Sequence, residues 1–226
     1  MTTSRPYQNQ MKYQLTASDY RALRSRLSGT AAESGDAGHI HTLRFASYRP
    51  RLASGQDQTP PATPQFALSY YNSDPTYLFL ERQMECAYDC AMVTEAECRA
   101  LLAGQTDWLL ARHNPVLRDF YSAITEQMLL PHVLLSYHRE TYSLDDLELW
   151  VALDTDLRTT LQHMDFLDPD LLARDTAGQE GMRLLQISYS TTIPDHILCV
   201  LEEAAPHRKL LSGNALPAFA GSGYVL

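Results

Sequence analysis

Polar and apolar side chains alternate along several short stretches of the chain. Residues 8–15 show this most simply, because one series of alternate positions is polar and the other apolar: Gln8, Gln10, Lys12 and Gln14 against Met11, Tyr13 and Leu15. A period of two residues is typical of a β-strand with one polar and one apolar face. Related patterns predict further strands at residues 39–45, 65–71, 76–85, 133–142, 147–154 and 183–190.

Other stretches carry the signals of helices. Residues 17–27 repeat apolar side chains at the spacing of a buried helical stripe. Thr94 and Glu97 form a capping-box pattern, which predicts a helix that begins at Thr94 and stops near Gly104. Two more helices are predicted at residues 115–128 and 195–203.

This order of elements predicts an α+β fold in which an antiparallel sheet closes, or nearly closes, into a barrel. Polar faces on many antiparallel strands suit a wet lumen that holds a ligand. The apolar outer faces then require helices packed against them. The side chains expected to point into the lumen are Glu81, Gln83, Gln65, Ala67, Ser69 and Gln186.

Chain length and charge narrow the classes of protein. The 226 residues, with a mass of 25.5 kDa, suit one domain over residues 1–226, with a proline-rich loop at residues 50–64. Eighteen Lys and Arg residues against 27 Asp and Glu residues give a formal net charge of -9. Such an acidic balance argues against a nucleic acid or an anionic membrane as the partner.

Cysteine spacing and hydropathy indicate the compartment. The four cysteines contain no C-x-x-C pair, which favours reduced thiols over disulfides or a zinc site. No apolar run reaches the roughly 18 residues that span a bilayer, and residues 1–10 lack the apolar core of a signal peptide. We therefore expect a soluble, cytoplasmic protein without a transmembrane segment.

Seven segments then stand in a distinctive order and spacing: QMKYQLTASDYRALRSRL, HIHTLRF, QFALSYYNSDPTYLFLERQ, LLAGQTDWLL, LLPHVLLSYHRETY, LWVALDTDLRTT and LLQISYSTTIP. This series resembles the VTC (vacuolar transporter chaperone) domain of bacterial polyphosphate polymerases, which are triphosphate tunnel metalloenzymes. The resemblance covers residues 8–224, and its landmarks are YYN, LE, LLAG, WLL, Y-x-R-E and LD.

The resemblance implies a tunnel of about eight antiparallel strands, flanked by helices. It also implies transfer of a nucleotide's terminal phosphate to a growing polyphosphate chain. That reaction needs inward Lys and Arg side chains to neutralise the polyanion, and carboxylates to hold Mn²⁺ or Mg²⁺ against the phosphates.

Charged residues are missing from this sequence at positions where the family pattern carries them. The residues that stand there are Gln10, His41, Ala46, Gln65, Ala67, Ser69, Leu130, His132, Ser136, Trp150, Gln186, Ser188 and Gly223. The apolar landmarks of the fold remain readable. This contrast predicts a preserved architecture with dismantled chemistry.

The retained residues form the candidate site that the resemblance implies. The remnants of the catalytic cations are Lys12, Arg139 and Arg158, and Glu81 is the candidate metal ligand. The candidate ligand-binding residues are Lys12, Tyr71, Glu81, Arg139 and Asp154.

A second interpretation of these charges stays open. Lys12, Glu81, Arg139 and Asp154 can form an internal ion-pair network without any ligand, because buried charges are rarely unpaired. The histidine pairs His39 with His41, and His132 with His138, each supply two metal ligands, but the spacing identifies no third.

Three functions are compatible with the sequence. In the first, a degenerate VTC-like protein has a structural or regulatory role, with an active VTC-like paralogue as partner or a small, less charged ligand, and no cofactor. In the second, the chain is a polyphosphate polymerase or another phosphotransferase that depends on Mn²⁺ or Mg²⁺. In the third, the chain is a deliberately altered protein whose tunnel has been emptied of charge, and no natural function is implied. The net acidity and Gln186 favour the first function over the second.

Overall fold

The computed structural model describes residues 9–30, 34–48, 64–72, 74–84, 88–144, 149–160, 166–168 and 181–211. Apart from Pro64, the proline-rich loop predicted at residues 50–64 lies outside these ranges, and so do Cys86 and Gly223. The strands are β1 (Asn9–Leu15), β2 (Ser34–Ser47), β3 (Gln65–Tyr71), β4 (Asp74–Gln83), β5 (Tyr88–Val93), β6 (Leu129–Leu144), β7 (Leu149–Thr160), β8 (Arg183–Tyr189) and β9 (Lys209–Leu210). The helices are α1 (Ala17–Thr30), α2 (Glu95–Leu102), α3 (Trp108–Ala111), α4 (Pro115–Gln127) and α6 (Asp195–Ala204).

The nine strands form an antiparallel sheet in the order β5-β4-β3-β2-β6-β7-β8-β1-β9. Within the described ranges this order has two ends, at β5 and at β9, and hydrogen bonds do not close it. The mixed α+β class and the antiparallel sheet are thus confirmed. Closure into a barrel stays a prediction, and the strand number is nine against the expected eight.

The chain divides into two compact units. The first unit comprises residues 1–8, 38–136 and 159–176, and the second comprises residues 9–37, 137–158 and 177–226. Each unit has its own apolar core between one face of its strands and its helices.

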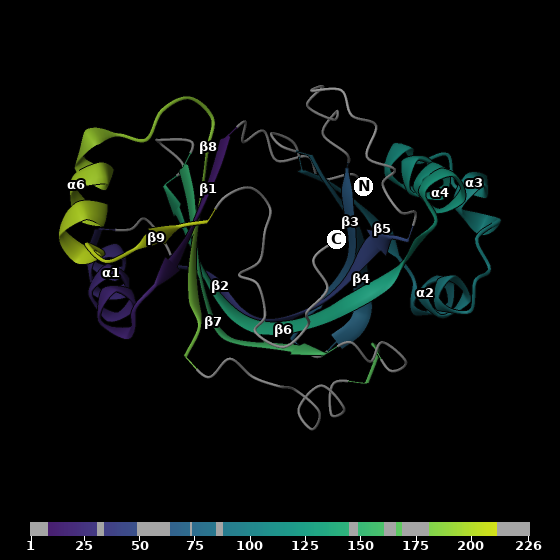
Figure 1. Cartoon of the computed structure of the whole chain (residues 1–226), viewed down its shortest axis with the longest axis horizontal. Helices are drawn as coiled ribbons and strands as arrows, with labels where there is room; N and C mark the ends of the chain where they lie inside the picture. Colours follow the sequence, from purple (N-terminus) through teal and green to yellow (C-terminus); the bar gives the residue numbers. More distant parts are fainter. Residues whose placement is uncertain are drawn as a thin grey trace. The chain divides into compact units, whose positions relative to one another are not determined.

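In the first unit, α2 and α4 lie against β4 and β5, as Figure 1 shows. The core contains alternate residues of the strands, such as Phe66, Leu68 and Leu80, together with Leu117 and Phe120 of α4. Phe120 packs against Phe66 with ring centroids 5.0 Å apart. The apolar faces of these strands are therefore covered by helices, as the sequence predicts.

In the second unit, α1 and α6 lie side by side against β1 and its neighbours (Figure 1). The core joins Leu23 and Leu27 of α1 and Leu201 of α6 to alternate strand residues such as Leu153 and Ile187. The spacing that predicts a buried stripe on residues 17–27 is thus confirmed, since Leu23 and Leu27 are buried.

Local signals fix the helix ends. The Thr94 hydroxyl accepts a hydrogen bond from the backbone N–H of Glu97, whose carboxylate accepts one from the backbone N–H of Thr94. This capping box begins α2 as predicted. Gly104 follows the helix with a φ of 80°, a left-handed conformation that glycine adopts without strain.

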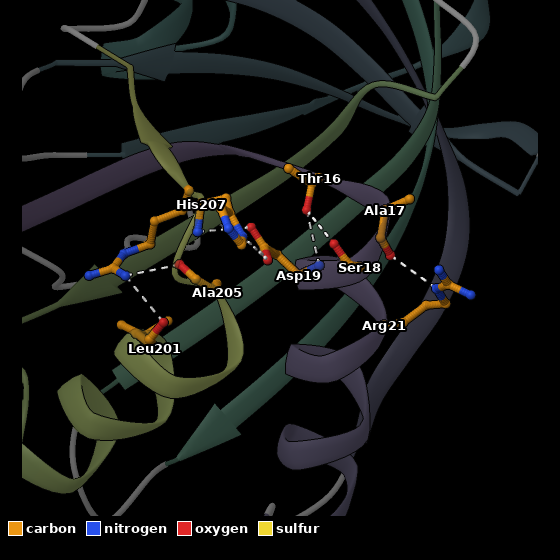
Figure 2. Close-up of polar contacts among 9 residues, drawn as sticks. Thr16, Ala17, Ser18, Asp19, Arg21, Leu201, Ala205 and His207 are labelled. Carbon is orange, nitrogen blue, oxygen red and sulfur yellow. Dashed lines mark hydrogen bonds and ion pairs between the residues drawn. The ribbon is translucent and has the colours of Figure 1, made fainter.

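A buried aspartate joins the start of α1 to the turn after α6. Figure 2 shows the Asp19 carboxylate facing His207, whose backbone N–H and Nδ1 each lie 3.2 Å from its oxygens. The Thr16 hydroxyl accepts a hydrogen bond from the backbone N–H of Asp19. Arg208 donates to the carbonyls of Leu201 and Ala205 at the end of α6. These contacts place β9 beside β1 within this unit.

The predicted strands and helices are all present, with bounds that differ by a few residues. Strand β2 extends beyond its predicted range at both ends, and β6 and β7 extend to Leu144 and Thr160. Three elements were not predicted, namely β5, β9 and the single-turn helix α3.

Candidate functional site

The first unit has a polar strand face opposite its core. Across β3 and β4, Gln65 pairs with Gln83, Ala67 with Glu81 and Ser69 with Phe79. Paired residues of antiparallel strands project from the same face of the sheet. The prediction that these residues share one face is therefore confirmed, whereas their exposure to a closed lumen stays a prediction.

Neighbouring strands extend this face. Arg44 of β2 pairs with Ala67, which places Arg44 and Glu81 on either side of Ala67 in one row. Thr42 pairs with Ser69, and their hydroxyl oxygens are 3.0 Å apart. These two hydroxyls therefore form a hydrogen bond with each other.

Glu81 interacts with a tyrosine that sequence reasoning missed. The Glu81 carboxylate accepts a hydrogen bond from the Tyr88 hydroxyl of β5. Burial raises the pKa of Tyr88 well above its ordinary value, and the negative charge of Glu81 adds to this effect. Tyr88 thus stays protonated and remains a hydrogen-bond donor to the carboxylate at physiological pH.

Aromatic and apolar side chains lie at one end of the same face. The rings of Tyr71 and Phe79 are in edge contact, with centroids 6.1 Å apart. Met92 of β5 pairs with Phe79, and 46% of its side chain is exposed. Tyr71, a predicted ligand-binding residue, is 41% exposed.

The polar face of the second unit is a regular grid of side chains from β7, β8 and β1. One row contains Trp150, Ser188 and Gln10, and the next contains Ala152, Gln186 and Lys12. Lys12 is partly buried and stands directly opposite Gln186. Position 186, where an acid is expected, thus lies next to the retained Lys12. The side chain at that position is the amide of Gln186.

Arg139 and Asp154 form a bidentate ion pair in this unit. The distances are 2.6 Å from Nε to Oδ1 and 2.7 Å from Nη2 to Oδ2. Only 19% of the Arg139 side chain and 8% of the Asp154 side chain are exposed. The guanidinium also lies 5.1 Å from the ring centroid of Tyr137 and 5.6 Å from that of Trp150. Two of the predicted site residues are therefore in direct contact and hold each other rigidly.

At one end of β7 and β8, apolar side chains replace the polar ones on this face. Leu184 follows the same alternation as Gln186, yet it forms a buried cluster with Leu157 and Met182. Asp156 has a φ of 53°, and a left-handed residue inside a strand is the mark of a bulge that shifts the alternation. This shift brings Leu157 to the side of Leu184 and leaves the neighbouring Arg158 exposed on the other side. The role predicted for Arg158 as a catalytic remnant stays a prediction.

Glu140, which the sequence motif groups with Arg139, belongs to the opposite side of β6. Its carboxylate accepts hydrogen bonds from Tyr20, Tyr142 and the Nε of Arg24, at 3.1, 3.0 and 2.7 Å. Burial raises the pKa of Glu140, but these donors, with Arg24 the strongest, outweigh burial and hold it below its ordinary value. Glu140 thus anchors α1 to the sheet.

Arg82 makes a similar contact in the first unit. It forms ion pairs with Asp89 of β5 and Asp119 of α4. The carboxylate of Asp89 thus pairs with a cation on the helix-covered side of the sheet.

His41, which stands at an expected arginine position, is buried in the first unit. Its ring stacks on Tyr70 with centroids 4.7 Å apart, and within the described part of the chain neither ring nitrogen has a hydrogen-bond partner. Burial, with a smaller effect of His39, lowers the pKa of His41 from 6.5 to about 4. The ring is therefore neutral at physiological pH.

The donor set does not fit a divalent cation. Within the described ranges, no three His, Cys, Asp or Glu side chains converge as a metal would require. The histidine pairs of the sequence gain no third ligand in these ranges. Mn²⁺ and Mg²⁺ bind best to oxygen ligands that include charged carboxylates, whereas Gln10 and Gln186 offer only neutral amide oxygens at expected acid positions. We derive no step that depends on a metal.

Comparison with known proteins identifies the family of this chain. Residues 8–206 match the model of the VTC domain. The chain belongs to the VTC domain family. The resemblance in the sequence is thereby confirmed, while the loss of most tunnel charges stays a prediction. No curated protein matches the chain.

Solved structures of low sequence identity are similar to this VTC domain. A Bacillus halodurans protein, named provisionally as an adenylate cyclase, is 10% identical, with a TM-score of 0.50 over 88% of each chain. HpAC1 from Hippeastrum, described as having a dominant triphosphatase activity, is 14% identical, with a TM-score of 0.49 over 86% of this chain and 84% of that one. At this low identity, the likeness to the Bacillus halodurans structure shows a shared fold and no shared activity.

The described part of this VTC domain contains no helix with the length and apolar character needed to cross a membrane.

Proposed function

We propose that the chain is a degenerate VTC domain that does not synthesise polyphosphate. It has a structural or regulatory role, or it binds a ligand of lower charge than triphosphate. The observation that carries this proposal is the bidentate pair of Arg139 and Asp154.

A polyanion site needs cations whose charge is available to the ligand. Both Nε and Nη2 of Arg139 already donate to the carboxylate of Asp154, which neutralises the guanidinium. A phosphate would have to break this largely buried pair, and Asp154 would then lose the two hydrogen bonds that Arg139 donates to it. Arg139 is therefore a poor phosphate ligand, although its residue type is retained.

Other positions where cations are expected to bind triphosphate carry uncharged side chains. Gln65, Ala67 and Ser69 occupy the expected cation positions of the first unit, and Ser188 occupies one in the second. Each charge-assisted hydrogen bond that is lost removes about 1.5 to 3 kcal/mol of binding. The loss of several such contacts is incompatible with tight triphosphate binding.

The proposal includes a closed tunnel in a cytoplasmic protein that needs no metal. Its partner is an active VTC-like paralogue, because a domain of the same fold without its own chemistry is suited to regulate or stabilise an active copy. Residues 1–226 act as one domain in this proposal.

A second function is favoured by family membership and by the retained charges. In that case the chain is a polyphosphate polymerase or another phosphotransferase that uses Mn²⁺ or Mg²⁺, with Lys12, Arg139 and Glu81 at the ligand. The amide of Gln186 beside Lys12 argues against it.

Two measurements separate these functions. Calorimetry with inorganic triphosphate in the presence of Mn²⁺ should show no binding in the low-micromolar range, and a polymer-formation assay with a nucleotide should show no chain growth. Metal-dependent chain growth or low-micromolar binding would establish the second function. Weak binding that disappears with added salt is expected from scattered basic groups and does not support it.

A rescue experiment tests the cause. Restoring Gln186→Glu and Ser188→Lys in the second unit, and Gln65→Lys, Ala67→Arg and Ser69→Arg in the first, should create triphosphate binding if the tunnel is intact. A folded variant that still fails to bind would show that the missing charges are not the reason.

A further inference from the structure

One end of the first unit's polar face has the composition of a site for a positively charged organic group. Tyr71 and Phe79 are in edge contact, Met92 pairs with Phe79, and Glu81 lies two positions from Phe79 on the same strand face. We call Tyr71, Phe79, Glu81, Tyr88 and Met92 the aromatic-acid patch.

The rings of this patch present accessible faces and edges next to a carboxylate. Tyr71 and Met92 are each exposed over more than two-fifths of their surface. The pKa of Tyr88 is raised by burial and by the nearby charge of Glu81, so the phenol stays neutral beside the carboxylate. Aromatic rings attract cations through their negative faces, and methionine packs well against methylated groups.

We propose that the aromatic-acid patch binds an organic cation with apolar substituents, such as a quaternary or alkylated ammonium group. The cation would lie against Tyr71 and Phe79, with its charge balanced by Glu81. This inference rests on the proposed function, because uncharged Gln65, Ala67 and Ser69 stand where cations expected of an active tunnel would repel such a ligand.

Arg44 is the cation in the same row as Glu81, on the far side of Ala67. Its charge weakens the field of the carboxylate at the patch. The proposal therefore predicts opposite effects for two substitutions that each neutralise one charge. Glu81→Gln should weaken binding of the cation, and Arg44→Gln should strengthen it.

The test uses the whole chain and choline as the probe. Calorimetry should show millimolar or tighter binding of choline and no binding of its uncharged carbon isostere. Glu81→Gln should weaken choline binding about three- to tenfold, and Tyr71→Leu about two- to tenfold. NMR titration of the wild-type protein should place the shift changes on the patch, which keeps the test valid if a variant folds poorly.

Matched controls come from α4, which covers the opposite face of the same sheet. Glu126→Gln and Tyr121→Leu remove the same groups from that helix and should leave choline binding unchanged. Equal binding of the uncharged isostere, or shift changes away from the patch, would overturn the proposal.

A parallel titration with triphosphate separates this inference from the function on which it rests. Tight triphosphate binding would overturn the proposed function and, with it, the inference. Absence of binding for both triphosphate and choline at about 10 mM would overturn the inference alone.

Discussion

The polar faces of the two units carry their charged side chains in different arrangements. In the second unit the retained cation Arg139 is bound by the retained acid Asp154, between two aromatic rings. In the first unit the expected cations at positions 65, 67 and 69 are absent, and Glu81 interacts with the neutral hydroxyl of Tyr88. One face holds a buried pair of opposite charges, and the other has uncharged side chains at three of the expected cation positions.

This difference shows that a retained residue type does not imply a retained role. Arg139 and Asp154 match the family pattern, but their pairing makes them part of the structure. Glu81 also matches it, and the neutral phenol of Tyr88 from β5 is one of its neighbours. We therefore expect substitutions on the two faces to change the free energy of unfolding by different amounts.

The largest effect is expected when the pair in the second unit is broken. Asp154→Ala leaves the guanidinium of Arg139 partly buried without its bidentate partner and should lower the free energy of unfolding by about 3 kcal/mol. Urea denaturation measures this loss.

A double variant is the control for that loss. Arg139→Met combined with Asp154→Leu removes both charges and should be within about 1 kcal/mol of the wild type. If Asp154→Ala alone is equally mild, the pair is not structural and Arg139 is available to a ligand.

A smaller effect is expected at Glu140, on the helix-covered side of the second unit. Glu140→Gln replaces a carboxylate that accepts from Arg24, Tyr20 and Tyr142, and it should cost about 2 kcal/mol near neutral pH. Because the folded pKa of Glu140 is lowered from 4.5, its contribution is present above that pH and is lost as the pH falls through the folded pKa. Acid titration of stability should thus be flatter below pH 4.5 in this variant.

The first unit should lose stability in a different pH window, because its core buries a histidine. The pKa of His41 is about 4 when folded and 6.5 when exposed, so the unfolded state binds up to one more proton between these values. Stability should therefore fall as the pH drops from 6.5 to 4. His41→Phe should remove this slope and leave the lower window of Glu140 unchanged, as denaturation at a series of pH values would show.

The smallest effect is expected at Glu81. Glu81→Gln keeps the side-chain shape and an acceptor for Tyr88, so the free energy of unfolding should change by less than about 1 kcal/mol. Thermal denaturation at pH 7 measures it, with Asp154→Ala as the comparison. A loss as large as that of Asp154→Ala would mean that Glu81 belongs to a buried ion pair like the one in the second unit.

Much of the fold could be predicted from the sequence, because alternation and helical spacing both depend on burial. The strand at residues 8–15 and the stripe on residues 17–27 are examples, and both contribute to the core of the second unit. Strand β5 was missed because it is short and carries Asp89, whose partner Arg82 is evident only once β4 and β5 are paired. The two residues of β9 are too few for any pattern.

The site was predicted less completely, because contact between strands depends on register. The sequence placed Arg139 and Asp154 in one network, and the structure confirms that they pair. Glu140 lies outside that network, because adjacent residues of a strand face opposite sides and the alternation rule separates Glu140 from Arg139. Tyr88 gave no signal, since its role follows from β5 lying next to β4.

The neighbouring residues Arg139 and Glu140 lie on opposite sides of β6 and have different partners. In evolutionary terms they are subject to different selection, although they are adjacent in the chain. Among homologous sequences, changes at position 139 should be accompanied by changes at position 154, and changes at position 140 by changes at positions 20, 24 and 142. A lineage that loses the ligand can then lose the first pair as a unit, while it must keep the second set for as long as α1 is attached to the sheet.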